Sequence, residues 1–209
     1  MSYVVLDGPD GCGKSSQALA LCQHLRGLGR SVLHVREPGS TPVGEALRQL
    51  LLAPTTGELR SVTEALLFAA ARAELVATVI APALARGEVV VGERSFVSTL
   101  VYQGLAPLPT AASAGLDLDW LRDLATRVHG ACWPDLLLLL DVPAEVARAR
   151  RTTRVDDRIE ARPAAYHDRV RDGFRRAAAL EPRARLLDAA RPFAEVHREI
   201  VTLVTRLGT

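Results

Sequence analysis

The sequence has little of the material that marks nucleic-acid-binding or membrane proteins. Aromatic residues make up 4% of the 209 residues, which leaves few side chains for a base-stacking surface. The formal net charge of +2 gives no strong attraction to a polyanion. The longest leucine run, at 136–140, is too short to span a membrane, and a strand pattern begins at residue 3 with no leader before it. We therefore expect no nucleic-acid partner and no membrane partner.

Cysteine is also scarce. Cys12, Cys22 and Cys132 form no CxxC pair and no spacing typical of metal ligands. An odd, sparse set of cysteines indicates reduced thiols rather than a disulfide framework, so we expect a cytoplasmic protein.

Lysine occurs once: Lys14 is one of 26 lysine and arginine residues, and the other 25 are arginine. It lies in GPDGCGKSS, at 8–16, which matches G-x-x-x-x-G-K-[ST] between an apolar run and a helical pattern. Lysine is a slim point charge, whereas arginine is a planar fork, so a tight phosphate loop can require lysine. The alternative is a glycine-rich turn without a ligand. The motif predicts a nucleoside triphosphate site with Mg²⁺ on Ser15, formed by Gly8, Asp10, Gly11, Cys12, Gly13, Lys14, Ser15 and Ser16.

Short apolar runs alternate with longer helical patterns along the chain. This order predicts one α/β domain over 1–209, with a three-layer, parallel five-stranded sheet that has helices on both faces. Ligands bind such sheets at the carboxyl ends of the strands. The strands are expected at 3–7, 31–35, 88–92, 136–142 and 184–188, and the helices at 15–28, 43–52, 62–85, 117–129, 144–151, 163–180 and 192–207.

The segments that follow the strands resemble the thymidylate kinase family, whose members transfer the γ-phosphoryl group of ATP to dTMP. The matching stretches are LDGPDGCGKSS, REPGSTPVGEALR, ERSFVSTLVYQG and DDRIE, in the family's order, within a resemblance over about residues 3–205. The resemblance implies a P-loop nucleoside monophosphate kinase-like fold and a dTMP kinase in dTTP synthesis. It also implies ATP and dTMP as ligands, Mg²⁺ as cofactor, and a homodimer formed through helices beside the sheet.

Five positions match family residues around the sugar and phosphate of the acceptor. The resemblance implies that Asp10 accepts a hydrogen bond from the sugar 3′-hydroxyl and that Arg48 and Arg94 hold the 5′-phosphate. Tyr102 matches the residue that disfavours ribose, and Glu37 matches the acidic residue that acts near the phosphates through Mg²⁺ and water. Arginine suits a phosphate because it can donate two parallel hydrogen bonds. The alternatives are a turn-favouring aspartate and ordinary surface arginines.

Four positions match family residues around the acceptor base. Phe68 matches the ring that stacks on thymine, and Arg72, one helical turn later, matches the arginine that reads the base. Thr99 and Gln103 match two further base-contacting positions. The alternative for Phe68 is an ordinary core side chain.

The segment 148–162 contains six arginines and three acidic residues. The resemblance implies a mobile lid here that closes over the transferring phosphoryl group; the alternative is a solvated, self-paired helix end. The family places a catalytic arginine in the phosphate loop or in the lid, and the loop here has none, as in the bacterial-type branch. We therefore expect lid arginines, with Arg151 and Arg154 as leading candidates, to act with Lys14 and Arg94 in catalysis.

Two positions depart from the family pattern, and they leave rival functions open. Glu93 stands where the family usually has Asp, and Ser40 stands where it has a second Gly. The triplet at 93–95 also resembles deoxynucleoside kinases, although Arg48 and the YQG segment argue against them. The remaining alternatives are another nucleoside monophosphate kinase and a nucleotide-binding switch without turnover, which would not need an arginine-rich lid.

Overall fold

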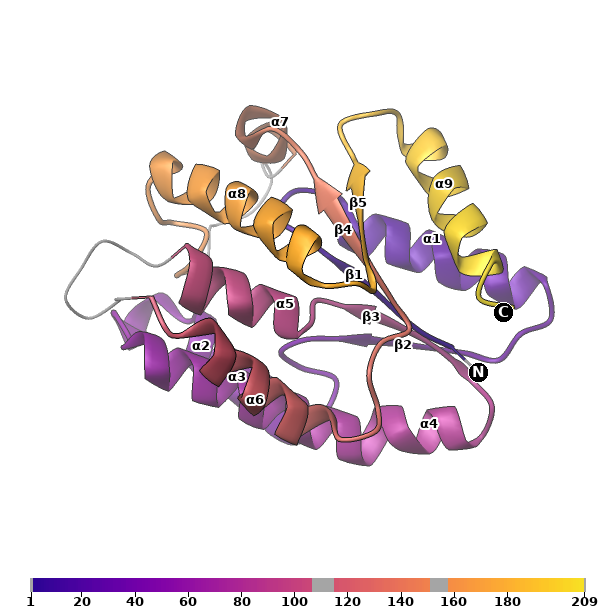
Figure 1. Ribbon diagram of the computed structural model, residues 1–209, viewed down its shortest axis with the longest axis horizontal. Coiled ribbons are helices and arrows are strands. Elements are labelled where there is room, and N and C mark those ends of the chain that lie inside the picture. Colours follow the sequence, from indigo (N-terminus) through magenta and orange to yellow (C-terminus); the bar gives the residue numbers. More distant parts are fainter. Residues whose placement is uncertain (1, 107–114, 151–157, 209) are drawn as a thin grey trace.

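The sheet is parallel and five-stranded in the computed structural model, which describes residues 2–106, 115–150 and 158–208. Its order is β2-β3-β1-β4-β5, so β1 is central (Figure 1). The predicted fold is confirmed. The outer strands are half-exposed rather than buried on both faces, because each has one neighbour. The strands are β1 (Ser2–Asp7), β2 (Val32–Arg36), β3 (Val89–Glu93), β4 (Leu136–Asp141) and β5 (Ala184–Asp188).

Helices cover both faces of the sheet because β1 buries alternate side chains on opposite sides. Tyr3 and Val5 join the core beneath α3 (Ser61–Leu75), α6 (Leu118–His129) and α8 (Ala164–Leu180). Val4 and Leu6 join the core beneath α1 (Lys14–Gly27) and α9 (Phe193–Thr205). The result is the predicted three-layer arrangement (Figure 1).

The remaining expected helices agree with the sequence except at one break. α2 (Pro42–Leu52) begins after Thr41, whose hydroxyl accepts from Gly44 N, and α7 spans Ala144–Ala149. A short 3₁₀ turn, η1, spans Pro54–Thr56. The single helix expected over 62–85 is α3, a π-helical segment η2 (Val76–Ile80) and α4 (Ala81–Ala85) in succession. Pro82 lacks a backbone N–H, so the regular hydrogen-bond ladder cannot continue through it.

A helix that the sequence analysis did not assign follows β3. It consists of α5 (Phe96–Thr99) and the π-helical η3 (Leu100–Leu105), and Ser95 caps it by accepting from Val97 N at 3.1 Å. Gly173 of α8 allows the close packing, because a Cβ there would lie 2.8 Å from Val101 Cγ1. The segment is short and mostly buried, and its polar residues face the pocket rather than solvent, so no solvent-facing polar stripe marks it as a helix.

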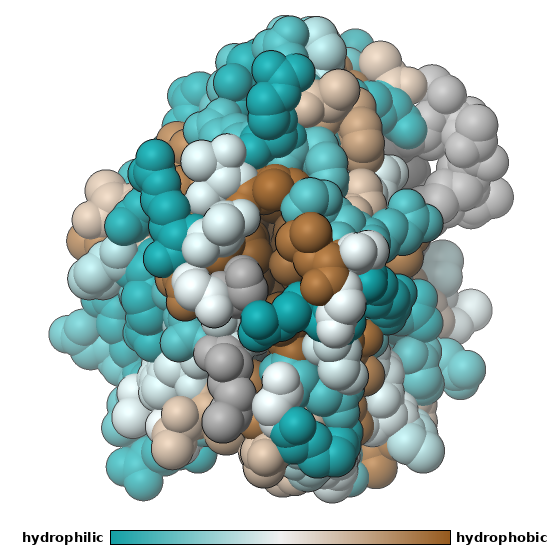
Figure 2. Space-filling view, turned by 90° about the vertical axis from the view of Figure 1, so that its right-hand side faces the viewer, coloured by the Kyte–Doolittle hydropathy of each residue, from teal (hydrophilic) through white to brown (hydrophobic). Residues whose placement is uncertain are grey.

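The helix from Ser61 to Ala85 is long and apolar enough to cross a membrane by length and composition alone. In the fold, Leu75 and Ile80 are fully buried against the sheet, and Glu64 and Arg72 form buried ion pairs, so packing accounts for its apolar character. At the end of the molecule where both termini lie, the surface is mainly hydrophilic, with small apolar patches near its centre (Figure 2).

Candidate active site

A pocket of about 940 Å³ lies at the carboxyl ends of the strands and straddles the loop after β1. Because β1 is central, residues after β2 and β3 line one side of this loop, and residues after β4 and β5 line the other. Most of the predicted site residues line it together: Asp10, Gly11, Cys12, Gly13, Lys14, Ser15, Ser16, Glu37, Arg48, Phe68, Arg72, Arg94, Thr99, Tyr102 and Gln103.

Three predicted residues are not among those that line the pocket. Gly8 lies at the start of the loop with φ of 145°, and a Cβ there would lie 2.6 Å from Leu140 O, so only glycine fits. Arg151 and Arg154 lie outside the described residues. Their predicted roles therefore remain predictions.

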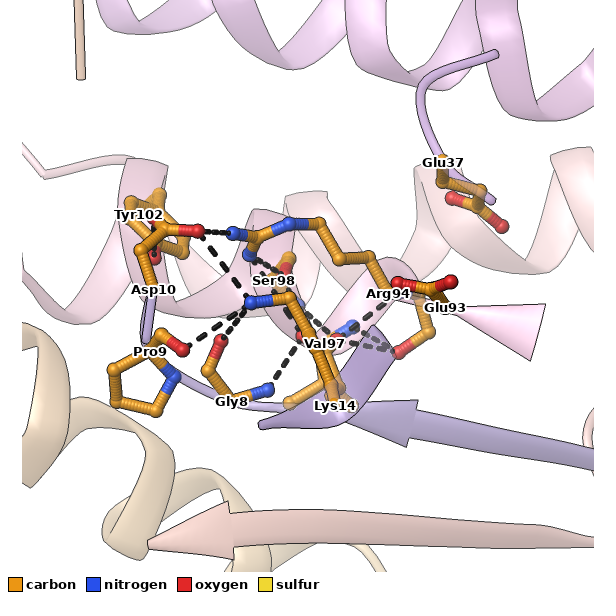
Figure 3. Close-up of polar contacts among 12 residues, drawn as sticks. Gly8, Pro9, Asp10, Lys14, Glu37, Glu93, Arg94, Val97, Ser98 and Tyr102 are labelled. Carbon is orange, nitrogen blue, oxygen red and sulfur yellow. Dashed lines mark hydrogen bonds and ion pairs between the residues drawn. The ribbon is translucent and has the colours of Figure 1, made fainter. Parts of the chain in front are cut away.

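The loop from Gly8 to Gly13 ends in an open helix terminus. Gly13 is the N-cap of α1 in the left-handed conformation, with no side-chain hydrogen bond to the cap within the part of the chain that is described. The first N–H groups of α1 are thus left for an anion, which the helix dipole also favours. Lys14 Nζ lies 3.2 Å from Pro9 O and 3.5 Å from Gly8 O, inside the curve of the loop (Figure 3).

Asp10 is the anionic centre of the loop. Its Oδ1 accepts from Arg94 Nη2 and lies 3.4 Å from Lys14 Nζ, and its Oδ2 lies 3.4 Å from Tyr102 Oη (Figure 3). Burial alone would raise the pKa of Asp10, but Arg94 and Lys14 hold it well below its usual range. Burial would lower the pKa of Arg94, but the attraction of Asp10 outweighs this effect and raises the pKa above its usual value. The pair therefore stays charged.

Arg94 reaches this position from a strained backbone. Its φ is 68°, the left-handed region that disfavours non-glycine residues, and its N–H donates to Leu6 O at 2.9 Å. The turn carries the guanidinium from the end of β3 across to the loop after β1. Strain of this kind persists only where the surroundings fix it, which is typical of functional sites.

Asp7 supplies that fixation, and the sequence analysis did not single it out. The carboxylate is fully buried: Oδ1 accepts from Gly8 N at 2.8 Å and Ser98 Oγ at 2.7 Å. Its Oδ2 accepts from Ser95 N and Ser95 Oγ at 3.0 Å and from Ser98 N at 3.2 Å. Asp7 therefore joins the phosphate loop to the segment that directly follows Arg94. The sequence feature that could have indicated this role is a carboxylate at the end of an otherwise apolar strand.

A second carboxylate, Glu93, contacts the loop from β3. Ser15 Oγ donates to Glu93 Oε2, and His34 Nε2 of β2 lies 2.9 Å from Glu93 Oε1. Burial raises the pKa of Glu93, but the hydrogen bonds from His34 and Ser15 bring it below its usual value. His34 thus lies against the carboxylate oxygen of Glu93 that Ser15 does not contact. The sequence analysis noted Glu93 only as a departure and gave His34 no role.

Arg72 lies deeper on the β2/β3 side and is held at two points. Its Nε donates to Glu37 Oε2 at 2.5 Å, and its Nη1 and Nη2 each lie 3.4 Å from Thr99 Oγ1. Burial raises the pKa of Glu37 more than Arg72 lowers it. Glu37 Oε1 has no hydrogen-bond partner among the described residues. The carboxylate of Glu37 is therefore engaged by Arg72, and its predicted metal role stays a prediction.

Arg48 and Phe68 complete this side of the pocket. Arg48 Nη1 donates to Pro38 O at 3.0 Å, which directs its guanidinium toward the segment after β2. Phe68 packs on the core from α3, four residues before Arg72, so both lie on one face of that helix. Aromatic and cationic side chains thus share one wall.

On the β4/β5 side, the sequence analysis expected the arginines after β4 only as part of the lid, and it gave the segment after β5 no role. Arg150, at the end of α7, donates from Nη1 to Ala189 O at 3.0 Å, and Arg191 and Phe193 also line this side. The Phe193 ring is 51% exposed and lies nearly parallel to the His197 ring, with centroids 6.0 Å apart. An exposed ring between arginines offers a stacking surface for a base.

The predicted lid at 148–162 is described only at its two ends. At its C-terminal end, Arg158 Nη2 donates to Glu64 Oε1 at 2.6 Å and Arg162 Nη2 does so at 3.2 Å. Both arginine side chains are less than 10% exposed. These two arginines are therefore paired with α3 and do not face the phosphate loop in this conformation.

Comparisons with known proteins agree with this geometry. The family model described as "Thymidylate kinase" matches residues 6–200. Curated thymidylate kinases of Thermomicrobium roseum and Symbiobacterium thermophilum are 45% and 42% identical, covering 98% and 97% of this chain and 95% and 92% of their own. A crystal structure of thymidylate kinase from Ehrlichia chaffeensis superposes with a TM-score of 0.76 at 27% identity and covers 98% of each chain.

Proposed function

Because this chain belongs to the thymidylate kinase family, an ATP-dependent nucleoside monophosphate kinase family that phosphorylates dTMP to dTDP, we propose that its pocket binds the two substrates on opposite sides of the phosphate loop. The acceptor dTMP occupies the β2/β3 side, and ATP occupies the β4/β5 side. The observation that carries this assignment is the Arg94–Asp10–Lys14 cluster, which places an acceptor-side arginine against the donor-side lysine (Figure 3).

On the acceptor side, each side chain suits one part of dTMP. Phe68 offers a face for the thymine ring, and Arg72 offers donors to its O4. Arg48 and Arg94 bind the 5′-phosphate, since a guanidinium matches a phosphate bidentately. Asp10, with Tyr102 beside it, accepts from the 3′-hydroxyl. Thr99 and Gln103 also contact the base.

On the donor side, the loop amides and α1 bind the β- and γ-phosphates of ATP. Lys14 lies inside the loop and moves from the loop carbonyls onto the phosphates, which are stronger acceptors. Ser16, Gly11, Cys12 and Gly13 contribute through backbone N–H groups. Arg150, Arg191 and Phe193 enclose the adenine base at the other end.

The residues present also fit Mg²⁺. Ser15 Oγ and Glu93 Oε2 lie in contact beside the loop, and hydroxyl and carboxylate oxygens are the ligands that Mg²⁺ prefers. Glu37 acts through water at most, given its pairing with Arg72. Bound there, the ion would neutralise charge on the phosphate oxygens of ATP.

Catalysis then rests on positioning and charge. Lys14 stabilises negative charge on the donor side, and Arg94 orients the acceptor phosphate so that its oxygen faces the γ-phosphoryl group. Asp10, kept ionised by both, fixes the sugar. The lid arginines Arg151 and Arg154 add charge stabilisation from the segment 148–162, within a single kinase domain over 1–209. Removal of an interaction made only in the transition state lowers kcat more than it changes KM.

A homodimer is part of the proposal. Neighbouring helices α2, α3 and α6 expose large apolar side chains, each between 39% and 49% exposed: Val43, Leu50, Val62, Leu66 and Trp120. Light scattering should give twice the chain mass, and Leu66→Glu should give monomers.

The buried or half-buried free thiols of Cys12, Cys22 and Cys132 support a cytoplasmic location.

Product analysis tests the function. Purified protein with Mg-ATP should convert dTMP to dTDP, with thymidine and dCMP as poor acceptors. Efficient phosphorylation of thymidine would instead indicate a deoxynucleoside kinase. ATP binding without transfer to any acceptor would indicate a nucleotide-binding switch.

A further inference from the structure

Gln103 of η3 is one of the most buried polar side chains on the pocket wall. It is 1% exposed, and its Nε2 donates to Glu64 Oε2 of α3 at 2.9 Å. Its Oε1 is equally buried but has no hydrogen-bond partner in the described parts of the chain. A buried carbonyl without a donor costs about 1–3 kcal/mol, so this atom calls for a ligand that donates.

Glu64 determines which way the Gln103 amide faces. Glu64 Oε1 accepts from Arg158 Nη2 at 2.6 Å and from Arg162 Nη2 at 3.2 Å, and its side chain is 4% exposed. A carboxylate flanked by two guanidiniums can only accept hydrogen bonds. The Gln103 NH₂ group must therefore point to Glu64, and its carbonyl must point the other way. An amide at position 64 would not impose this choice.

Gln103 lies on the same pocket wall as Arg72, which Glu37 and Thr99 hold in place. Together Arg72 and Gln103 thus offer a donor group and an acceptor. Thymine and uracil present a carbonyl at O4 and a donor at N3–H, which match both. Cytosine presents an amino donor at C4 and an acceptor at N3, which clash with both.

We propose that Glu64 is a positioning residue for base selection: by fixing the Gln103 carbonyl toward the pocket, it makes the site prefer a pyrimidine with a ring N–H at N3. The proposal rests on the placement of the acceptor base proposed above. Glu64 contacts no substrate itself and acts through Gln103. Its ion pairs with Arg158 and Arg162 hold it in place at that wall.

The test compares Glu64→Gln with Arg158→Gln. Both remove a charge from the same buried cluster, but only Glu64→Gln lets the Gln103 amide turn over. We expect the ratio of kcat/KM for dTMP to that for dCMP to fall at least about ten-fold in Glu64→Gln, mainly through better use of dCMP. In Arg158→Gln the ratio should stay within about two-fold of wild type. Calorimetric dissociation constants for dTMP and dCMP without ATP should follow the same pattern.

Four outcomes would contradict this reasoning. A folded Glu64→Gln enzyme with the wild-type ratio would overturn the proposal, as would an equal fall in both variants. If Glu64→Gln does not fold, Gln103→Met keeps the ion cluster and removes the carbonyl. It should lower kcat/KM for dTMP about ten-fold without lowering it for dCMP, and an unchanged ratio would overturn the proposal. A wild-type enzyme that uses dTMP and dCMP equally would instead refute the acceptor placement itself.

Discussion

Asp7→Asn tests how the phosphate loop and Arg94 are held together. The amide keeps the shape of the carboxylate but replaces one acceptor with a donor. If NH₂ takes the place of Oδ1, it faces Gly8 N–H and Ser98 Oγ, and only the hydroxyl can turn. If NH₂ takes the place of Oδ2, it faces the backbone N–H groups of both Ser95 and Ser98, which is worse. The cheaper orientation leaves one buried N–H unpaired and removes the charge from the remaining hydrogen bonds.

The magnitude follows from these losses. One unpaired buried N–H costs about 1–3 kcal/mol, and hydrogen bonds to a charged group contribute about 1 kcal/mol more than neutral ones. The unpaired N–H and the three hydrogen bonds that remain at Oδ2 together give a destabilisation of about 4–6 kcal/mol. For a chain of this length that corresponds to a fall in Tm of about 8–24 °C. The KM for dTMP should also rise, because the turn that aims Arg94 loosens.

The matched control is Asp188→Asn at the end of β5. Asp188 is exposed and accepts from Ala190 N at 3.0 Å, so its loss should change stability by about 0.5 kcal/mol or less. Thermal and urea unfolding at one pH, followed by circular dichroism, measure both variants. An Asp7→Asn protein within about 1 kcal/mol of wild type would refute this account of Asp7.

Further predictions concern Lys14, His34 and His129. Lys14→Arg should lower kcat at least about 100-fold despite the conserved charge, because the fork does not fit within the loop; near-normal turnover would contradict this. His34→Leu removes the group that holds Glu93 Oε1, so the Mg²⁺ concentration for half-maximal rate should rise about ten-fold, and an unchanged value would exclude a positioning role. Burial, aided by Arg72, lowers the pKa of His129 to about 4 from 6.5. Between these pH values the unfolded chain binds the proton and the folded chain does not, so the free energy of unfolding should fall by roughly 3 kcal/mol as pH drops from 6.5 to 4. Urea titrations across this range should show this fall in the free energy of unfolding in wild type but not in His129→Gln. Identical pH profiles for the two proteins would contradict the role given to His129.

Local patterns were sufficient for the sheet and the phosphate loop. Each strand is a short apolar run, and the GKS motif between a strand and a helix predicts a phosphate-binding loop. The base-side residues came from the family resemblance; they line the pocket together, and their roles remain predictions.

What the sequence did not disclose depends on contacts between distant residues. Ser15 meets Glu93 across 78 positions, and Asp7 meets Ser98 across 91. A carboxylate in a sequence does not reveal whether it ends in solvent or under five donors. The helix over 96–105 was missed because it is short and buried on nearly all sides, and because its polar residues face the pocket rather than solvent.

The measurement that tests the central claim most directly is the KM of each substrate in Phe68→Ala and Phe193→Ala. These two rings line opposite sides of the phosphate loop. Loss of base stacking costs about 1–3 kcal/mol, so Phe68→Ala should raise the KM for dTMP about ten-fold and leave the KM for ATP within about two-fold. Phe193→Ala should do the reverse. If both variants weakened both substrates alike, or if the effects were exchanged, the assignment of acceptor and donor sides would be contradicted.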